Sequence, residues 1–158
     1  SKYSASFFFL LMTQKYGFCN LQRRFVRDLP FLPENDYICD MNVEDLRDFC
    51  LSIDEQVEEG FPFAKFPGGK NVLVYYIFGS MFAYFNINDL SCVCLKCQPG
   101  KIVDLVERYP YIGAPYNGHA KYWIGVNALQ ADTIILKELI VNSYQIVAFQ
   151  NQSKKIKS

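Results

Sequence analysis

The stretch APYNGHAKYW, residues 114–123, holds the only histidine and the only tryptophan of the chain, His119 and Trp123. Three further aromatic or basic side chains lie around them: Tyr116, Lys121 and Tyr122. Imidazole, ammonium and phenol groups at this spacing could serve as a general acid or base, ligate a metal, or contact a phosphate and stack on a base. Alternatively, Trp123 begins a strand and is buried, with Tyr116 packed beside it.

The segment CVCLKC contains three of the six cysteines, Cys92, Cys94 and Cys97. Structural zinc needs four thiolate or imidazole ligands. On a regular strand Cys92 and Cys94 point to one face and Cys97 to the other, which divides the three thiols. A second cysteine pair is missing, so the segment favours buried, reduced thiols over a zinc site or a disulfide framework.

Two further patterns speak against enzymatic chemistry. The segment PGGK at 67–70 lacks the glycine spacing and the Ser or Thr of a phosphate-binding loop, and we interpret it as a turn before a strand. Nucleophilic catalysis needs a base that a third group orients, and His119 has no carboxylate near it in sequence. We therefore expect no catalytic residue, no cofactor, no resident metal and no small-molecule substrate.

The charges are balanced in number but unevenly distributed. The chain has 16 basic and 16 acidic side chains. Seven acids lie between Glu44 and Glu59 beside one base, whereas residues 60–158 hold ten bases and five acids. The chain can thus present a basic face to nucleic acid. The acidic run offers an alternative, a protein-interaction or cation-binding surface whose oxygen ligands come from three carboxylates: Glu44, Asp48 and Glu55.

A helix and a strand meander are the first elements expected to position these residues. Asn42 is a helix cap with Asp45 at the third helical position. The buried stripe of this helix is expected at Leu46, Phe49, Cys50 and Ile53. Strands rich in β-branched and aromatic residues follow at 71–78, 81–87 and 91–97. We expect their turns at Gly79–Ser80 and Asn88–Asp89.

A helix, a strand and a last helix complete the expected order. Pro99 opens a helix to about Tyr109, with an apolar side made of Ile102, Val103, Leu105 and Val106. A loop covers 110–122, and WIGVN forms a strand. The last helix starts near Asp132, with an inner stripe of Leu136, Leu139, Ile140 and Val147. This order predicts a two-layer α+β fold, an antiparallel sheet with helices packed on one face.

The chain divides into three parts. Residues 1–40 form an N-terminal extension without sustained periodicity, which we interpret as accessory or as an arm that pairs with another copy. Residues 41–150 form the domain, and 151–158 a basic C-terminal tail. The longest apolar run, FFFLLM, is too short to span a membrane. We expect a cytoplasmic protein with no membrane partner.

Six segments, in order, carry a resemblance. They are MNVEDLRDFCLSI, the FPF at 61–63, GSMFAYF at 79–85, LKCQP at 95–99, APYNGHAKYWIGV at 114–126 and LKELIVNSYQIV at 136–147 with its Ser143–Tyr144 pair. From Met41 to about Phe149 the chain resembles the MmcQ/YjbR-like family. The resemblance implies a CyaY-like (frataxin-like) fold and a bacterial DNA-binding protein of the double-wing type.

The resemblance implies DNA contact through hairpins. Together with the basic bias after residue 60, it leads us to expect that phosphate is contacted through the hairpin tips, the 114–123 loop and the basic tail. The expected nucleic-acid-binding residues are Ser80, Lys96, His119, Lys121, Tyr122, Lys154, Lys155 and Lys157. The chain departs from the family pattern at three points. Ser80 stands where the family often has Lys, and Gln98 where it often has Asp. His119 does not fall on the position of the family histidine, whereas Lys121 matches a family lysine.

Overall fold

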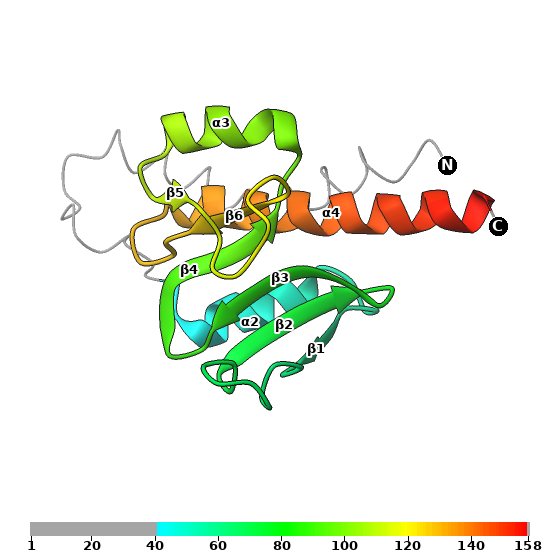
Figure 1. Cartoon of the computed structure of the whole chain (residues 1–158), viewed down its shortest axis with the longest axis horizontal. Coiled ribbons are helices and arrows are strands. Elements are labelled where there is room, and N and C mark those ends of the chain that lie inside the picture. Colours follow the sequence, from blue (N-terminus) through cyan, green and yellow to red (C-terminus); the bar gives the residue numbers. More distant parts are fainter. Residues whose placement is uncertain (1–40, 158) are drawn as a thin grey trace, which may run out of the picture. The chain divides into compact units, whose positions relative to one another are not determined.

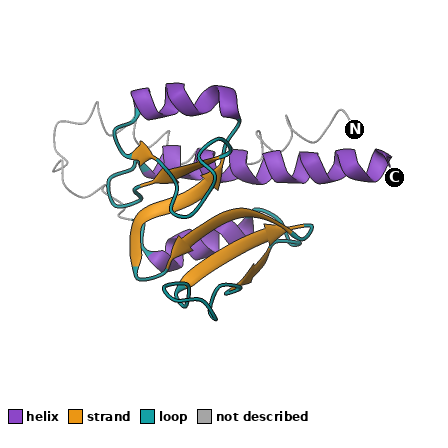
Figure 2. Cartoon of the chain, viewed as in Figure 1, coloured by secondary structure: helices purple, strands orange, loops and turns teal. Residues whose placement is uncertain are grey.

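The computed structural model describes residues 41–157, with the backbone alone for 155–157. The expectations for the extension 1–40 and for the side chains of Lys155 and Lys157 lie outside the described residues. The described part is an antiparallel sheet with three helices (Figures 1 and 2). Its elements are α2 (Val43–Ser52), β1 (Glu58–Gly60), β2 (Val72–Ile77), β3 (Ser80–Asn86), β4 (Asp89–Lys96), α3 (Pro99–Arg108), β5 (Ile112–Gly113), β6 (Trp123–Val126) and α4 (Thr133–Lys157). The expected α+β class is confirmed.

The sheet has six strands in the order β1-β2-β3-β4-β6-β5. The expected meander is its centre, β2 to β4. Strand β6 pairs with β4 on one side, Lys96 opposite Trp123, and with β5 on the other. This pairing places the 114–122 loop, which joins β5 to β6, beside the end of β4.

Helix α2 begins as its sequence predicts. The Asn42 side chain accepts a hydrogen bond from the Asp45 N–H at 2.9 Å, and the Asp45 carboxylate accepts one from the Asn42 N–H at 3.3 Å. This reciprocal pair satisfies two backbone donors that the helix itself leaves unpaired. The expected buried stripe is confirmed at all four positions: Leu46, Phe49, Cys50 and Ile53.

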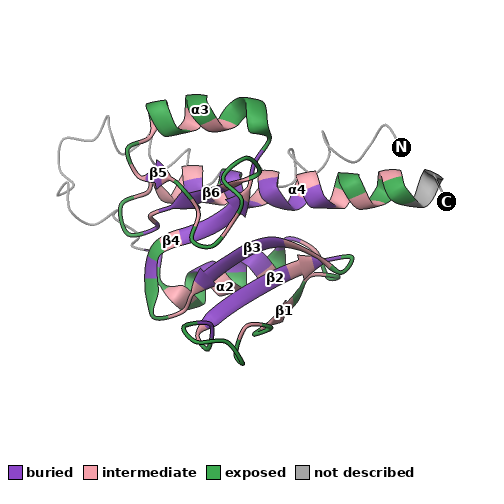
Figure 3. Cartoon of the chain, in the orientation of Figure 1, coloured by how far each residue is buried: buried purple, intermediate pink, exposed green. Residues whose placement is uncertain are grey.

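The core lies between the sheet and the helices α2 and α4 (Figure 3). Tyr75 contacts Phe82 and Phe85 with ring centroids 6.2 and 5.9 Å apart, and Phe82 meets Tyr144 of α4 edge-on at 5.8 Å. The expected inner stripe of α4 is confirmed as buried: Leu136, Leu139, Ile140 and Val147. The C-terminal residues 151–157 continue this helix rather than forming an irregular tail.

The apolar side expected for α3 is present but not buried. None of its residues is buried, and Val103 is 62% exposed. The reason is its place: α3 packs at the short outer strand β5 rather than over a sheet face (Figure 1). Its Gln98 cap makes no side-chain hydrogen bond, so Pro99 is its main N-terminal signal.

Both hairpin turns lie one residue earlier than predicted. Ile77 pairs with Ser80, so the first turn is Phe78–Gly79, with φ of 52° and 74°. Two left-handed residues are what a twisted two-residue hairpin requires, and here Phe78 adopts that conformation despite its side chain. In the second hairpin Asn86 pairs with Asp89, and the turn is Ile87–Asn88. Ser80 and Asp89 are therefore strand residues.

Two short strands, β1 and β5, were not predicted. Strand β1 reads EEG and carries no β-branched or aromatic residue, and β5 has two residues.

Within the described residues, no helix combines the length and the apolar composition that crossing a membrane requires.

Candidate functional site

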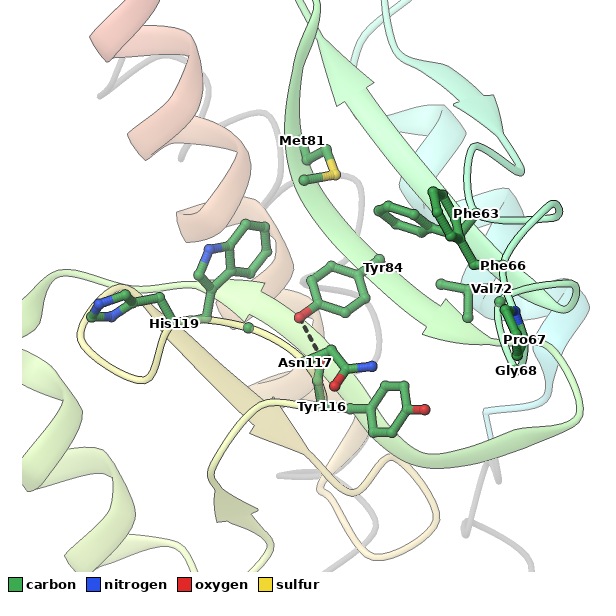
Figure 4. A pocket seen from close by; sticks show the side chains of 13 residues that line it. Phe63, Phe66, Pro67, Gly68, Val72, Met81, Tyr84, Tyr116, Asn117 and His119 are labelled. Carbon is green, nitrogen blue, oxygen red and sulfur yellow. Dashed lines mark hydrogen bonds between the residues drawn. The ribbon is translucent and has the colours of Figure 1, made fainter.

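Two loops, 61–71 and 114–122, lie against the sheet on the side of Val72, Tyr84 and Trp123. Because side chains alternate along a strand, this is the face turned away from Tyr75 and Phe85. The two loops and the sheet enclose a pocket of about 390 Å³ (Figure 4). That volume lies in the range of small-ligand sites.

Aromatic and apolar side chains make up most of the pocket wall. The 61–71 loop contributes Phe63, Phe66 and Pro67; the sheet contributes Val72, Met81, Tyr84 and Trp123; the 114–122 loop contributes Tyr116, Asn117 and His119. The wall contains no Asp or Glu. An aromatic surface without carboxylates suits a planar ring and does not repel an anion beside it.

Tyr84 and Cys94 hold the 114–122 loop in place through the backbone of Tyr116. The Tyr84 hydroxyl donates to the Tyr116 carbonyl at 2.7 Å, and the Tyr116 N–H donates to Cys94 Sγ at 3.3 Å. Burial raises the pKa of Tyr84, which keeps its hydroxyl protonated as a donor. The backbone of Tyr116 is thus anchored, while the residue as a whole is 56% exposed. The alternative of a buried Trp123 with Tyr116 packed beside it therefore does not describe the structure, in which Trp123 is only partly buried.

The 114–122 loop ends in a tight turn around His119. The N–H groups of Tyr122 and Trp123 both donate to the His119 carbonyl, at 2.9 and 3.1 Å. The imidazole Nδ1 accepts the N–H of Lys121 at 3.3 Å, and its ring lies 5.7 Å from that of Tyr122. His119 lies at the edge of the pocket in Figure 4. These contacts orient a loop; they do not pair the imidazole with an acid or a nucleophile.

Lysine ammonium groups lie over aromatic rings next to the pocket. Lys96 Nζ is 5.5 Å from the centre of the Trp123 ring, and Lys121 Nζ is 5.3 Å from that of Tyr122. Partial burial, and then the positive charge of Lys154, lower the pKa of Lys96. Lys154 of α4 is therefore close enough to act on Lys96. Trp123, which begins its strand as predicted, is only partly buried, because one face serves the pocket.

The structure brings several of the predicted nucleic-acid-binding residues together. His119 lines the pocket, Lys96 lies over one of its walls, and Lys121 and Tyr122 belong to the same loop. Ser80 begins β3 next to the pocket residue Met81. The two hairpin turns, in contrast, carry no basic side chain.

The acidic carboxylates of the alternative site do not gather. Glu44 and Asp48 are exposed on α2, whereas Glu55 lies beyond its end at Ser52. In the described part of the chain, no three His, Cys, Asp or Glu side chains group as a metal site. Another acid of the run, Glu59, is engaged by Arg47, whose Nε donates to both carboxylate oxygens at 3.1 and 2.9 Å.

Most of the pocket was not predicted from the sequence. Phe63, Phe66, Met81, Tyr84 and Asn117 come from segments more than fifty residues apart at their extremes. The aromatic residues of the 61–71 loop were a usable signal in the sequence, because a simple turn between two elements does not need them. Asn117, with φ of 52°, adopts the left-handed conformation that asparagine tolerates, and its amide side chain faces the pocket region in Figure 4.

Cys92 and Cys94 share one face of β4, as predicted, with their sulfurs 3.7 Å apart. Cys94 is buried and Cys92 is half-buried. The hydrogen bond from Cys94 lowers the pKa of Cys92 to about 6 against the opposing effect of burial. Cys97 lies past the end of β4 and its thiol donates to the Gln98 carbonyl at 3.6 Å.

The fold and the pocket define an α+β domain with one helix-covered and one loop-covered sheet face. A family model described as YjbR matches residues 54–146, more than half of the chain, and the chain belongs to this family. The resemblance stated from the sequence is therefore confirmed at the level of the family.

Two solved structures are similar to the chain. A protein of Deinococcus radiodurans described by the domain DUF419 has 26% sequence identity and a TM-score of 0.59, over 67% of this chain and 78% of its own. A protein of Pseudomonas syringae has 20% identity and a TM-score of 0.57, over 68% of this chain and 99% of its own, and shows the fold alone. No curated protein matches the sequence significantly.

Proposed function

We propose that this protein is a non-enzymatic DNA-binding protein that holds an unpaired base in the aromatic pocket and contacts the neighbouring phosphates with Lys96 and Lys121. The observation that carries the proposal is the aromatic pocket without carboxylates, beside which two ammonium groups lie over aromatic rings. Base stacking on aromatic side chains together with a basic path for the backbone is the usual means of binding single strands.

The hairpin tips of the double-wing interpretation have a smaller part in this proposal. Phe78–Gly79 and Ile87–Asn88 offer phosphate only backbone N–H groups, and Ser80 a hydroxyl. Such groups position a backbone but do not supply the counterion-releasing charge. Lys154, close to Lys96, extends the basic path along α4 toward the C-terminus.

The proposal includes no catalysis. His119 is the only imidazole of the chain, and its Nδ1 is used by the Lys121 N–H. A general base needs a free nitrogen within reach of a substrate proton and a partner that orients it. The contacts of His119 give it a part in shaping the loop instead.

The test is binding of fluorescently labelled DNA to the full chain at low salt, followed by anisotropy. We expect a single-stranded oligonucleotide to bind more tightly than the duplex of the same sequence. Tyr116→Ala removes an exposed stacking ring and should weaken binding by about 1–3 kcal/mol. Lys121→Gln should weaken it for all sequences alike.

Two matched variants serve as controls. Phe149→Ala removes an aromatic ring that is 72% exposed on α4, and Lys101→Gln removes an exposed lysine of α3; neither residue lines the pocket. Both should bind as the unmodified chain does. The proposal is wrong if the full chain binds no DNA at low salt, or if Tyr116→Ala and Lys121→Gln bind as tightly as the controls.

A further inference from the structure

We propose that Cys92 and Cys94, together with the backbone carbonyls of Ala114 and Tyr116, form a binding site for a thiophilic divalent ion of the zinc group, Zn²⁺ or Cd²⁺. The site lies on β4, at the inner side of the 114–122 loop. The two cysteines do not line the aromatic pocket, but the site shares the backbone of Tyr116 with it.

The two thiols already have the spacing of metal ligands. Their sulfurs are 3.7 Å apart on one face of the strand. A tetrahedral ion with metal–sulfur bonds of about 2.3 Å holds two sulfurs about 3.8 Å apart. The observed separation of the two sulfurs therefore matches that of two ligands of one ion.

Two backbone carbonyls complete a four-atom set. Cys92 Sγ lies 4.0 Å from the Ala114 carbonyl oxygen, and Cys94 Sγ lies 3.9 Å from that of Tyr116. In a tetrahedral site with metal–oxygen bonds of about 2.1 Å, sulfur and oxygen ligands stand about 3.6 Å apart. Each carbonyl oxygen thus lies within a few tenths of an ångström of this distance from its own sulfur. The Tyr116 oxygen also accepts from Tyr84, and a carbonyl has two lone pairs.

The surroundings leave room for an ion and a route to it. A Cβ at Gly125 would lie 2.4 Å from the Ala114 carbonyl oxygen and 2.8 Å from Cys92 Sγ, so glycine is the residue that fits beside these two ligand atoms without displacing them. On its outer side Cys92 lines a second hollow of about 240 Å³, together with Asn86, Asp89 and Ser91. An ion can thus reach the thiols through a polar opening without crossing the core.

Soft thiolates explain the choice of metal. Thiolate ligands select zinc-group and cuprous ions over Mg²⁺ and Ca²⁺, which prefer oxygen alone. Binding breaks two S–H bonds, forms two S–metal bonds and releases two protons to solvent, with no electron transferred. The carbonyls supply the ligands that side chains of the described residues do not, since no third His, Cys, Asp or Glu joins the pair.

The first experiment is a Cd²⁺ titration of the full chain, with the thiolate-to-cadmium charge-transfer absorption as readout. Cys19 and Cys39 are changed to serine throughout, because both lie in the part outside the described residues. We expect one ion per chain. Cys92→Ser or Cys94→Ser should each weaken Cd²⁺ binding about tenfold or more. Even the loss of a residue that only supports a metal ligand weakens metal binding by about this factor. Cys97→Ser is the matched control and should bind as the parent does.

A second measurement does not depend on variants that must fold. In the native full chain, Cd²⁺ should protect half-buried Cys92 from alkylation by a maleimide, and Mg²⁺ at the same concentration should not. Peptide mapping by mass spectrometry identifies the labelled cysteine. Unchanged labelling of Cys92 with Cd²⁺ overturns the proposal, as does equal Cd²⁺ affinity of the Cys92→Ser and Cys97→Ser chains. Either outcome leaves the DNA-binding proposal standing.

Discussion

Ser143 links the last helix to two strands of the sheet by hydrogen bonds. It is fully buried on α4, and its hydroxyl donates to the carbonyl of Phe82 on β3. The same oxygen accepts the N–H of Lys96 on β4 at 2.7 Å. One hydroxyl thus satisfies a backbone acceptor and a backbone donor on adjacent strands where no water reaches them. The Ser143–Tyr144 pair was noticed in the sequence as part of the family resemblance, and its role here is structural.

Ser143→Ala should lower the free energy of unfolding by about 1–3 kcal/mol, because it leaves the Phe82 carbonyl and the Lys96 N–H buried without a partner. Chemical denaturation with urea measures the change. Ser153→Ala on the same helix is the control: its hydroxyl donates to Phe149 at a solvent-exposed site, and its loss should cost less than about 0.5 kcal/mol. Equal stability of the two variants would contradict this role of Ser143.

At the scale of the elements, an ion pair links helix α2 to strand β1. Arg47 of α2 donates to both carboxylate oxygens of Glu59 on β1. These hydrogen bonds and the opposite charge raise the pKa of Arg47 and hold the pKa of Glu59 below its usual value. Strand β1 has three residues and a single strand neighbour, so this side-chain contact is a second link that holds it at the sheet edge.

The depressed pKa of Glu59 sets the direction of a pH effect. The pair's contribution to stability is complete above the unfolded-state pKa of glutamate, about 4.3, and is lost as the pH falls through the lower folded-state value. Glu59→Gln should therefore be less stable than the unmodified chain at pH 7. The difference in stability between the two chains should shrink as the pH is lowered below about 4. Thermal unfolding at each pH measures this difference. A difference that is constant from pH 7 to pH 3 would exclude this ionic contribution.

The sequence predicted elements where local signals were strong and missed them where tertiary pairing decides. The cap at Asn42 and the stripes of α2 and α4 follow from side-chain spacing, and the structure confirms them. Strands β1 and β5 carry no such signal and exist because β2 and β6 offer free edges. The first hairpin turn was misplaced because Phe78 adopts a left-handed conformation that its residue type does not favour.

The pocket is a property of the whole molecule. Phe63 and Phe66 precede β2, Tyr84 belongs to β3, and Tyr116 and Trp123 follow α3, so only the sheet order places these rings together. The sequence predicted nucleic-acid contacts for the 114–123 segment and Lys96 but gave no means of pairing these residues with the 61–71 loop. The local charge is also a property of the whole fold. The chain is neutral in total, yet the pocket wall has no acidic side chain and Lys96 and Lys121 lie beside it.

This local basic character in a neutral molecule predicts a shallow salt dependence of DNA binding. Lys96, Lys121 and the nearby Lys154 can neutralise two or three phosphates, for which log K against log salt has a slope of about −2 on single strands. Affinity should thus fall roughly tenfold to twentyfold between 50 and 200 mM NaCl. Anisotropy titrations across this range measure the slope, and Lys121→Gln should make it shallower by about 0.7, while Lys101→Gln leaves it unchanged. A slope of about −5 or steeper would place the main contact on other cations, because three lysines cannot release that many counterions.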